Sequence, residues 1–111
     1  MEVVVIYATA ASEAEAATIG RTLVEERLAA SANIIPGVRS FYWWRGRFEA
    51  GAEAVLVLKT RRALAERAVA RVTALHSYAC PGVLVLPVAL GNPAYLDWIA
   101  AETASSPNVP T

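Results

Sequence analysis

The chain has 111 residues, of which 56% are hydrophobic and 18% charged, and its ten basic and ten acidic side chains cancel to a formal net charge of zero. This length suits one domain, and this apolar content excludes a disordered chain. A neutral chain lacks the basic field that attracts nucleic acids and anionic membranes, so we expect neither as a partner.

The chain carries few signs of export. Its single cysteine, Cys80, excludes a disulfide within the chain, and residues 1–5 lack the basic start of a signal peptide. No apolar run reaches the roughly 20 residues that a membrane-spanning helix needs. We expect a cytoplasmic protein. Because a domain of this size buries only part of its apolar surface, we also expect it to associate with copies of itself.

The first predicted elements are a strand and a helix. Residues 3–8 form a β-branched run that is apolar on both faces, which indicates an interior strand. Ser12 and Glu15 have the spacing of a capping box, so a helix begins there. Apolar residues at helical spacing extend this helix to about Ala30.

Residues 33–60 predict a long, bent hairpin. Aromatic and β-branched residues dominate the segment, Arg45 and Gly46 mark its tip, and residues 36–37 (Pro-Gly) predict a bulge or kink on an edge strand. The return arm is expected to loosen around Gly51 and then to form an interior strand at residues 55–58.

The C-terminal part predicts a second helix over residues 61–75 and a loop from His76 to residue 82. Residues 83–86 predict a fourth strand that ends or bulges at Pro87. Asn92 and Pro93 suit the N-cap and the first position of a short final helix. Residues 105–111 predict a flexible tail.

The order of these elements predicts an α+β fold, a ferredoxin-like βαββαβ sandwich with an extra C-terminal helix, in one domain over residues 1–104. Helices on one face of such a sheet leave the other face uncovered. Because the predicted strands are too apolar for a solvated face, we expect that face to pack against other copies of the chain.

Ferredoxin-like sheets also occur in RNA-binding domains, which stack bases on exposed aromatic rings. Here Val4, Ile6, Leu56 and Leu84 stand where such rings would be needed, and the net charge is zero. RNA binding is therefore the least favoured of the functions considered.

Three residue types that occur once in the chain are the first candidates for a site. His76 and Cys80 are potential metal ligands, but one of each cannot complete a zinc site, and both also suit structural positions. Lys59 is the only lysine and ends an interior strand, where a pocket can form.

The aromatic run at residues 41–44 could stack a ligand, although rings that alternate on a β arm more often pack on both faces or between subunits. The chain contains no phosphate-binding loop, Gly-x-Ser-x-Gly or Cys-x-x-Cys motif. No catalytic residue is predicted.

The most specific part of the sequence lies before the predicted tip of the hairpin. It runs through residues 23–30 (LVEERLAA) and 33–37 (NIIPG) into Ser40, Tyr42, Trp44 and Gly46. It is reinforced by Glu53, Lys59, Thr60, His76, Tyr78, Pro81, Leu86, Pro87, Gly91, Asn92 and residues 95–98. With these residues the chain resembles the CutA family of divalent-ion tolerance proteins from about residue 3 to residue 99.

The resemblance implies a compact homotrimer whose subunits are similar in architecture to PII signalling proteins. Strands are expected to pair across subunit edges, and the long hairpin is expected to reach a neighbour. The implied function is tolerance of copper and other divalent cations, with weak binding of Cu²⁺ or another divalent ion. No required cofactor and no enzymatic reaction are implied.

On this resemblance, His76 is expected to bind the metal with Cys80 or with carboxylates such as Glu53 from a neighbouring subunit. Two donors common in the family are missing, because Ser31 stands in place of a cysteine and Gly82 in place of a glutamate. Ser77 replaces a proline between the histidine and the tyrosine of the loop.

The clefts between subunits are expected to be lined by some of Trp44, Lys59, His76 and Tyr78. An alternative function follows from the similarity to PII proteins: a signalling or adaptor trimer whose clefts bind a small anion at Lys59 and pass a conformational change to an unidentified protein partner. This alternative rests on fold analogy.

Overall fold

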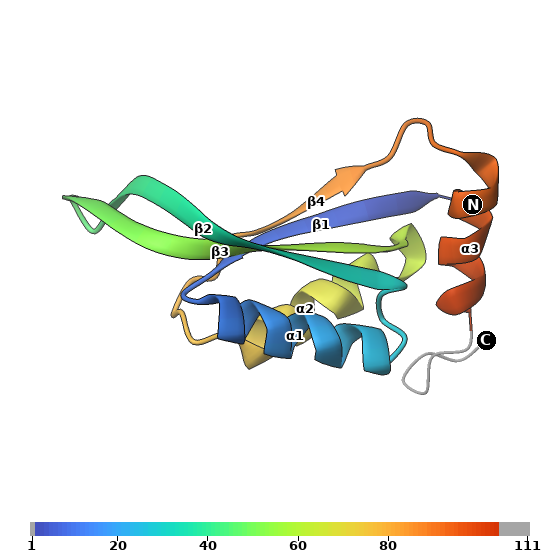
Figure 1. Cartoon of the computed structure of the whole chain (residues 1–111), viewed down its shortest axis with the longest axis horizontal. Coiled ribbons are helices and arrows are strands. Elements are labelled where there is room, and N and C mark those ends of the chain that lie inside the picture. Colours follow the sequence, from blue (N-terminus) through green and yellow to red (C-terminus); the bar gives the residue numbers. More distant parts are fainter. Residues whose placement is uncertain (1, 105–111) are drawn as a thin grey trace.

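The computed structural model describes residues 2–104, which form a four-stranded antiparallel sheet and three α-helices (Figure 1). The elements are β1 (Val3–Ala10), α1 (Glu13–Glu25), β2 (Ser31–Trp44), β3 (Arg47–Arg61), a 3-10 turn (Arg62–Leu64), α2 (Ala65–Leu75), β4 (Val83–Pro87) and α3 (Pro93–Glu102). This order confirms the predicted ferredoxin-like βαββαβ sandwich with an added C-terminal helix. The predicted tail at residues 105–111 lies outside the described residues.

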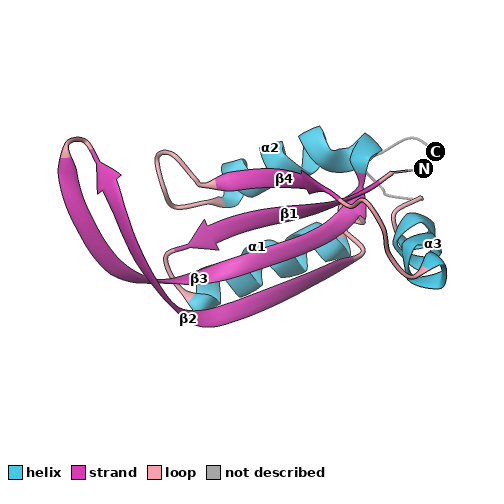
Figure 2. Cartoon of the chain, turned by 90° about the horizontal axis from the view of Figure 1, so that it is seen from above, coloured by secondary structure: helices cyan, strands magenta, loops and turns pink. Residues whose placement is uncertain are grey.

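The sheet has the strand order β2-β3-β1-β4, so β1 and β3 are interior strands and β2 and β4 are its edges. Helices α1 and α2 cover one face, and α3 lies at the end of the sheet opposite the tip of the β2–β3 hairpin (Figures 1 and 2). Side chains alternate along a strand, so Ile6 and its partner Leu58 are buried on the helix side while Tyr7 stands on the open side, 39% exposed.

The core lies between the sheet and the two helices. Helix α1 contributes Ala16, Ile19 and Leu23, which are at most 1% exposed and recur every three or four residues along one stripe. Gly20 lies on the same stripe, and a Cβ there would be 2.9 Å from Leu56 Cδ1. The helix therefore packs closely on β3 because this position has no side chain.

Helix α1 ends earlier than predicted, at Glu25 rather than near Ala30. Arg27 has a φ of 61°, which a right-handed helix cannot contain, and the amides of Leu28 and Ala29 both donate to the carbonyl of Leu23, at 2.9 and 3.2 Å. Leu28 and Ala29 still fill the core, which is why the helical pattern appeared to continue.

The second helix begins later than predicted. Residue 61 is the last residue of β3, residues 62–64 form a 3-10 turn, and α2 begins at Ala65. Its predicted end at Leu75 is confirmed, with His76 as the C-cap. The predicted start was too early because four residues of the helical pattern belong to the strand end and to the tighter turn.

The hairpin confirms the predicted tip and bulge. Arg45 and Gly46 have φ values of 50° and 77°, the left-handed pair that a two-residue hairpin turn requires. The register shifts between Ile35 and Val38, at the Pro-Gly bulge. The expected loosening around Gly51 is wrong, because that residue pairs in register with Ser40.

The open face and the hairpin expose much of the apolar surface. Phe41, Trp43 and Phe48 are 61–73% exposed on the hairpin, and Leu84 on β4 is 62% exposed. Val4, Ile6 and Leu56, which the RNA argument placed on the open face, are instead buried on the helix side. Within residues 2–104, no helix has both the length and the apolar character needed to cross a membrane.

We predict that Gly20→Val lowers the free energy of unfolding by about 2 kcal/mol, because the new side chain would overlap Leu56 and Ala32 at the contact between α1 and the sheet. Chemical denaturation measures this difference. Gly51→Val is the matched control, since nothing lies within 4 Å of a Cβ at Gly51, and we expect its effect to stay within about 0.5 kcal/mol. Equal losses in both variants would contradict the close approach of α1.

Candidate functional site

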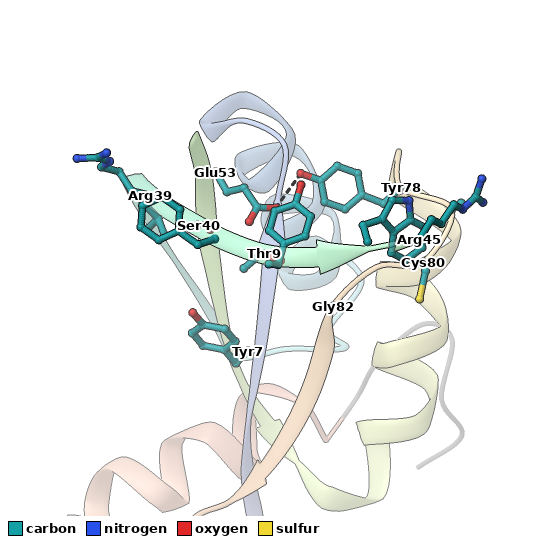
Figure 3. A pocket seen from close by; sticks show the side chains of 14 residues that line it. Tyr7, Thr9, Arg39, Ser40, Arg45, Glu53, Tyr78, Cys80 and Gly82 are labelled. Atoms are coloured by element: carbon teal, nitrogen blue, oxygen red, sulfur yellow. Dashed lines mark hydrogen bonds between the residues drawn. The ribbon is translucent and has the colours of Figure 1, made fainter. Parts of the chain in front are cut away.

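A concavity of about 710 Å³ lies at the base of the hairpin, where β1, β2, β3 and the loop after α2 meet (Figure 3). Tyr7 and Thr9 of β1 and Glu53 of β3 line it, together with most residues of the ranges 38–45 and 78–82. Its volume lies in the range typical of small-molecule sites. The loop of residues 76–82, called here the 76–82 loop, forms one of its walls.

His76 holds the start of the 76–82 loop. Its Nδ1 atom accepts a hydrogen bond from the backbone N–H of Tyr78, at 3.1 Å, so the ring proton must lie on Nε2, which donates to the carbonyl of Thr9 at 2.7 Å. The imidazole also packs on the Tyr78 ring, with centroids 4.7 Å apart. Both ring nitrogens of the neutral imidazole are therefore engaged in positioning the loop.

Glu15 anchors the same loop to α1. Ser12 caps the helix by accepting from the Glu15 amide, at 3.1 Å, which confirms the predicted N-terminus, although the Glu15 carboxylate reaches back to the amide of Ala11 rather than to that of Ser12. Its Oε2 accepts from the amide of Ser77, at 2.9 Å. Burial raises the pKa of Glu15, but the hydrogen bonds from Ser77 and Ala11 outweigh this effect and lower it below the usual value.

Tyr78 and Glu53 join the loop to the hairpin. The Tyr78 hydroxyl donates to Glu53 Oε2 at 2.8 Å, and both side chains line the concavity (Figure 3). Burial, followed by the hydrogen bond to Glu53 and its negative charge, raises the pKa of Tyr78 well above that of a free phenol. The phenol therefore keeps its proton and remains a donor to the carboxylate.

Two of the three predicted metal ligands line the concavity. Glu53 and the exposed thiol of Cys80 line the concavity, whereas His76 is not among its lining residues. Within the part of the chain that the structure describes, no group of three or more histidine, cysteine, aspartate and glutamate side chains could hold a metal ion. The described residues of a single copy of the chain therefore provide at most a partial metal site.

Two of the three predicted ligand-binding residues share the concavity. Trp44 and Tyr78 line it, and the Arg45 guanidinium lies over the Trp44 ring, 5.3 Å from its centroid. Lys59 is not among the lining residues. Its Nζ donates to Asn33 Oδ1 at 2.6 Å, and the ammonium lies 5.9 Å from the ring centroid of Tyr95 on α3.

Tyr7, Thr9 and Ser40 also line the concavity, although the sequence did not predict a role for them there. A signal for the first two was present, because Tyr7 and Thr9 alternate with the buried Ile6 and Ala8 and must therefore face the open side of the sheet. No comparable signal existed for Ser40, since the bulge at residues 36–37 changes which face the following side chains occupy.

We predict that Glu15→Ala lowers the free energy of unfolding by about 1 kcal/mol at neutral pH, the usual contribution of an N-terminal capping interaction. Because the folded pKa is lowered, the contribution of the Glu15 charge is complete above the unfolded carboxyl pKa of about 4.3 and is lost as the pH falls through the folded pKa. Urea unfolding at several pH values should therefore show that the difference in the free energy of unfolding between Glu15→Ala and wild type becomes smaller at acidic pH.

Glu13→Ala is the matched control, because Glu13 is an exposed acid in the same first helical turn. We expect its effect to be smaller and to change less with pH. A Glu15→Ala difference that is constant from neutral to acidic pH would contradict the proposed anchoring by an ionised carboxylate.

Comparison with known proteins identifies the family. A family model described as CutA1 divalent ion tolerance protein matches residues 4–102. The divalent-cation tolerance protein CutA of Thermus thermophilus is 46% identical over 99 residues, which cover 89% of this chain and 96% of that protein. The chloroplastic protein CutA 1 of Oryza sativa is 37% identical over 93% of this chain, and the match spans 58% of that longer protein.

Solved structures agree with the sequence matches. The crystal structure of CutA1 from Oryza sativa superposes with a TM-score of 0.89 at 36% identity, covering 93% of this chain and 94% of that one. The Thermus thermophilus protein superposes with a TM-score of 0.86 at 46% identity, covering 93% of this chain and 99% of that one. The chain therefore belongs to the CutA1 divalent ion tolerance protein family.

Proposed function

We propose that this chain acts in divalent-cation tolerance as a homotrimer that binds Cu²⁺ or another divalent ion weakly and catalyses no reaction. The observation that carries the proposal is the presence of the Glu53 carboxylate and the Cys80 thiol in the lining of one concavity. A carboxylate and a thiolate are both ligands for transition metals, and the thiolate favours softer ions such as copper in its reduced state.

The incomplete ligand set supports weak binding. His76 is the third proposed ligand, but its ring would have to release the Thr9 carbonyl or the Tyr78 amide before it could coordinate a metal. That rearrangement costs free energy and lowers the affinity. A site of this kind would suit transient occupancy rather than a permanent structural metal.

Assembly into a trimer is supported by the two uncovered edges of the sheet and by the exposed apolar surface. Edge strands β2 and β4 have unpaired backbone groups, and Phe41, Trp43, Phe48, Leu84 and Leu86 are 48–73% exposed. Burial of these side chains by neighbouring copies would remove the apolar surface from water. Neighbouring copies would also bring additional ligands close to the concavity.

A PII-like signalling trimer that binds a small anion at Lys59 is the alternative. It has less support, because the Lys59 ammonium is bonded to Asn33 and lies outside the concavity lining. A ligand that binds the native trimer raises its unfolding midpoint. A thermal-shift screen with nucleotides and organic anions that gave no such increase would contradict this alternative.

Native mass spectrometry with and without a slight excess of Cu²⁺ tests the first proposal. We expect a trimer that binds copper saturably, in multiples of three or at one ion per threefold axis. Glu53→Gln and Cys80→Ser should each weaken copper binding by about tenfold or more. Glu66→Gln removes the same charge from an exposed position on α2 and should leave the affinity unchanged.

A trimer without saturable copper would contradict metal binding while leaving the assembly intact. Saturable binding that neither Glu53→Gln nor Cys80→Ser weakens would place the metal elsewhere. A monomer would contradict the assembly proposal itself.

A further inference from the structure

Besides the carboxylate that the metal proposal uses, the lining of the concavity contains aromatic rings, which metal binding does not use. Glu53 is the only acidic residue among the described lining residues, and Tyr7, Tyr42, Trp44 and Tyr78 are among the rings that line the same space. The Tyr78 hydroxyl occupies Oε2 of Glu53 at 2.8 Å. The negative charge is therefore held in place, and no other described residue forms a hydrogen bond with the carboxylate.

Aromatic faces attract cations, because the ring quadrupole places negative charge above and below the plane. Two contacts on this hairpin show the effect within the chain. The guanidinium of Arg39 lies 5.9 Å from the ring centroid of Phe41, and that of Arg45 lies 5.3 Å from that of Trp44. Rings combined with a carboxylate provide the two elements by which proteins recognise organic ammonium groups.

We propose that this concavity binds a small organic ammonium ion, with the Glu53 carboxylate as counter-ion and the rings of Tyr42, Trp44 and Tyr78 as its walls. The proposal goes beyond divalent-cation tolerance and requires no metal. A volume of about 710 Å³ leaves room for an ammonium group together with an organic substituent.

The positions of the charged side chains favour a cation over an anion at the centre of the concavity. Arg39 and Arg45 add two positive charges to the lining, but their side chains extend away from Glu53 in opposite directions (Figure 3). Each guanidinium already lies over a ring of the hairpin. An anion that approached Glu53 would meet its carboxylate before it met either arginine.

The test uses the 111-residue protein, freed of metal with a chelator, and tetramethylammonium chloride as the probe. Titration is followed by the NMR signal of the Trp44 indole N–H, with sodium chloride at equal ionic strength as the salt control. We expect saturable shifts with tetramethylammonium, and binding at least about fivefold weaker for the neutral analogue tert-butanol, which lacks the charge that carboxylate and rings attract.

Variants separate the role of the charge from that of the fold. Glu53→Gln should weaken tetramethylammonium binding by about fivefold or more, whereas Glu66→Gln on α2 should leave it unchanged. If Glu53→Gln does not fold, Trp44→Leu, followed by a backbone amide signal of the hairpin, removes one wall and should weaken binding by a similar factor.

Several results would overturn the proposal: no saturable shift, equal affinity for tert-butanol, unchanged affinity in Glu53→Gln, or tighter binding of inorganic phosphate than of tetramethylammonium. The copper experiment gives an independent answer, because it is performed without tetramethylammonium and reports bound metal by mass. Failure of one proposal can therefore be distinguished from failure of the other.

Discussion

The structure depends on β1, one of the two interior strands that are hydrogen-bonded on both sides. It pairs with β3 from Val3 to Ala10 and with β4 from Val4 to Ala8. Because side chains alternate along a strand, one row of β1 enters the core beneath α1 and α2 while the other row stands on the open face. A shift of one residue would bury Tyr7 and Thr9 and expose Ile6. The register of β1 therefore decides both the core and the lining of the concavity.

The 76–82 loop and the open-face residues of β1 together line the concavity. The loop contains no regular secondary structure, yet side-chain hydrogen bonds join it to three elements: to β1 through His76, to α1 through Glu15 and to β3 through Tyr78. The bonds of His76 and Tyr78 satisfy polar groups that partial burial would otherwise leave unpaired. The ionisable side chains that could bind a ligand thus also hold the loop in place. A ligand that binds His76 must compete with the hydrogen bonds of its ring.

Local patterns predicted most of the fold. The N-caps at Ser12 and Asn92, the bulge at residues 36–37 and the two-residue tip of the hairpin were all predicted from residue types whose backbone preferences are strong. The predictions were wrong where a tertiary contact, rather than a local sequence preference, determines the backbone conformation. Leu28 and Ala29 continue the apolar stripe of α1, but they reach the core from a turn with a left-handed Arg27, which periodicity alone cannot distinguish from a helix.

The sequence by itself determined the family, the order of the elements and the rare residues able to carry chemistry, because these depend on residue identity and short spacings. Only the tertiary structure decided which of those residues meet. It joined Tyr78 to Glu53, 25 positions away, directed both nitrogens of His76 to backbone partners, and left Lys59 bonded to Asn33 outside the concavity. These contacts depend on strand pairing and on the path of the loop, and no spacing along the chain encodes the distance between two side chains so far apart in sequence.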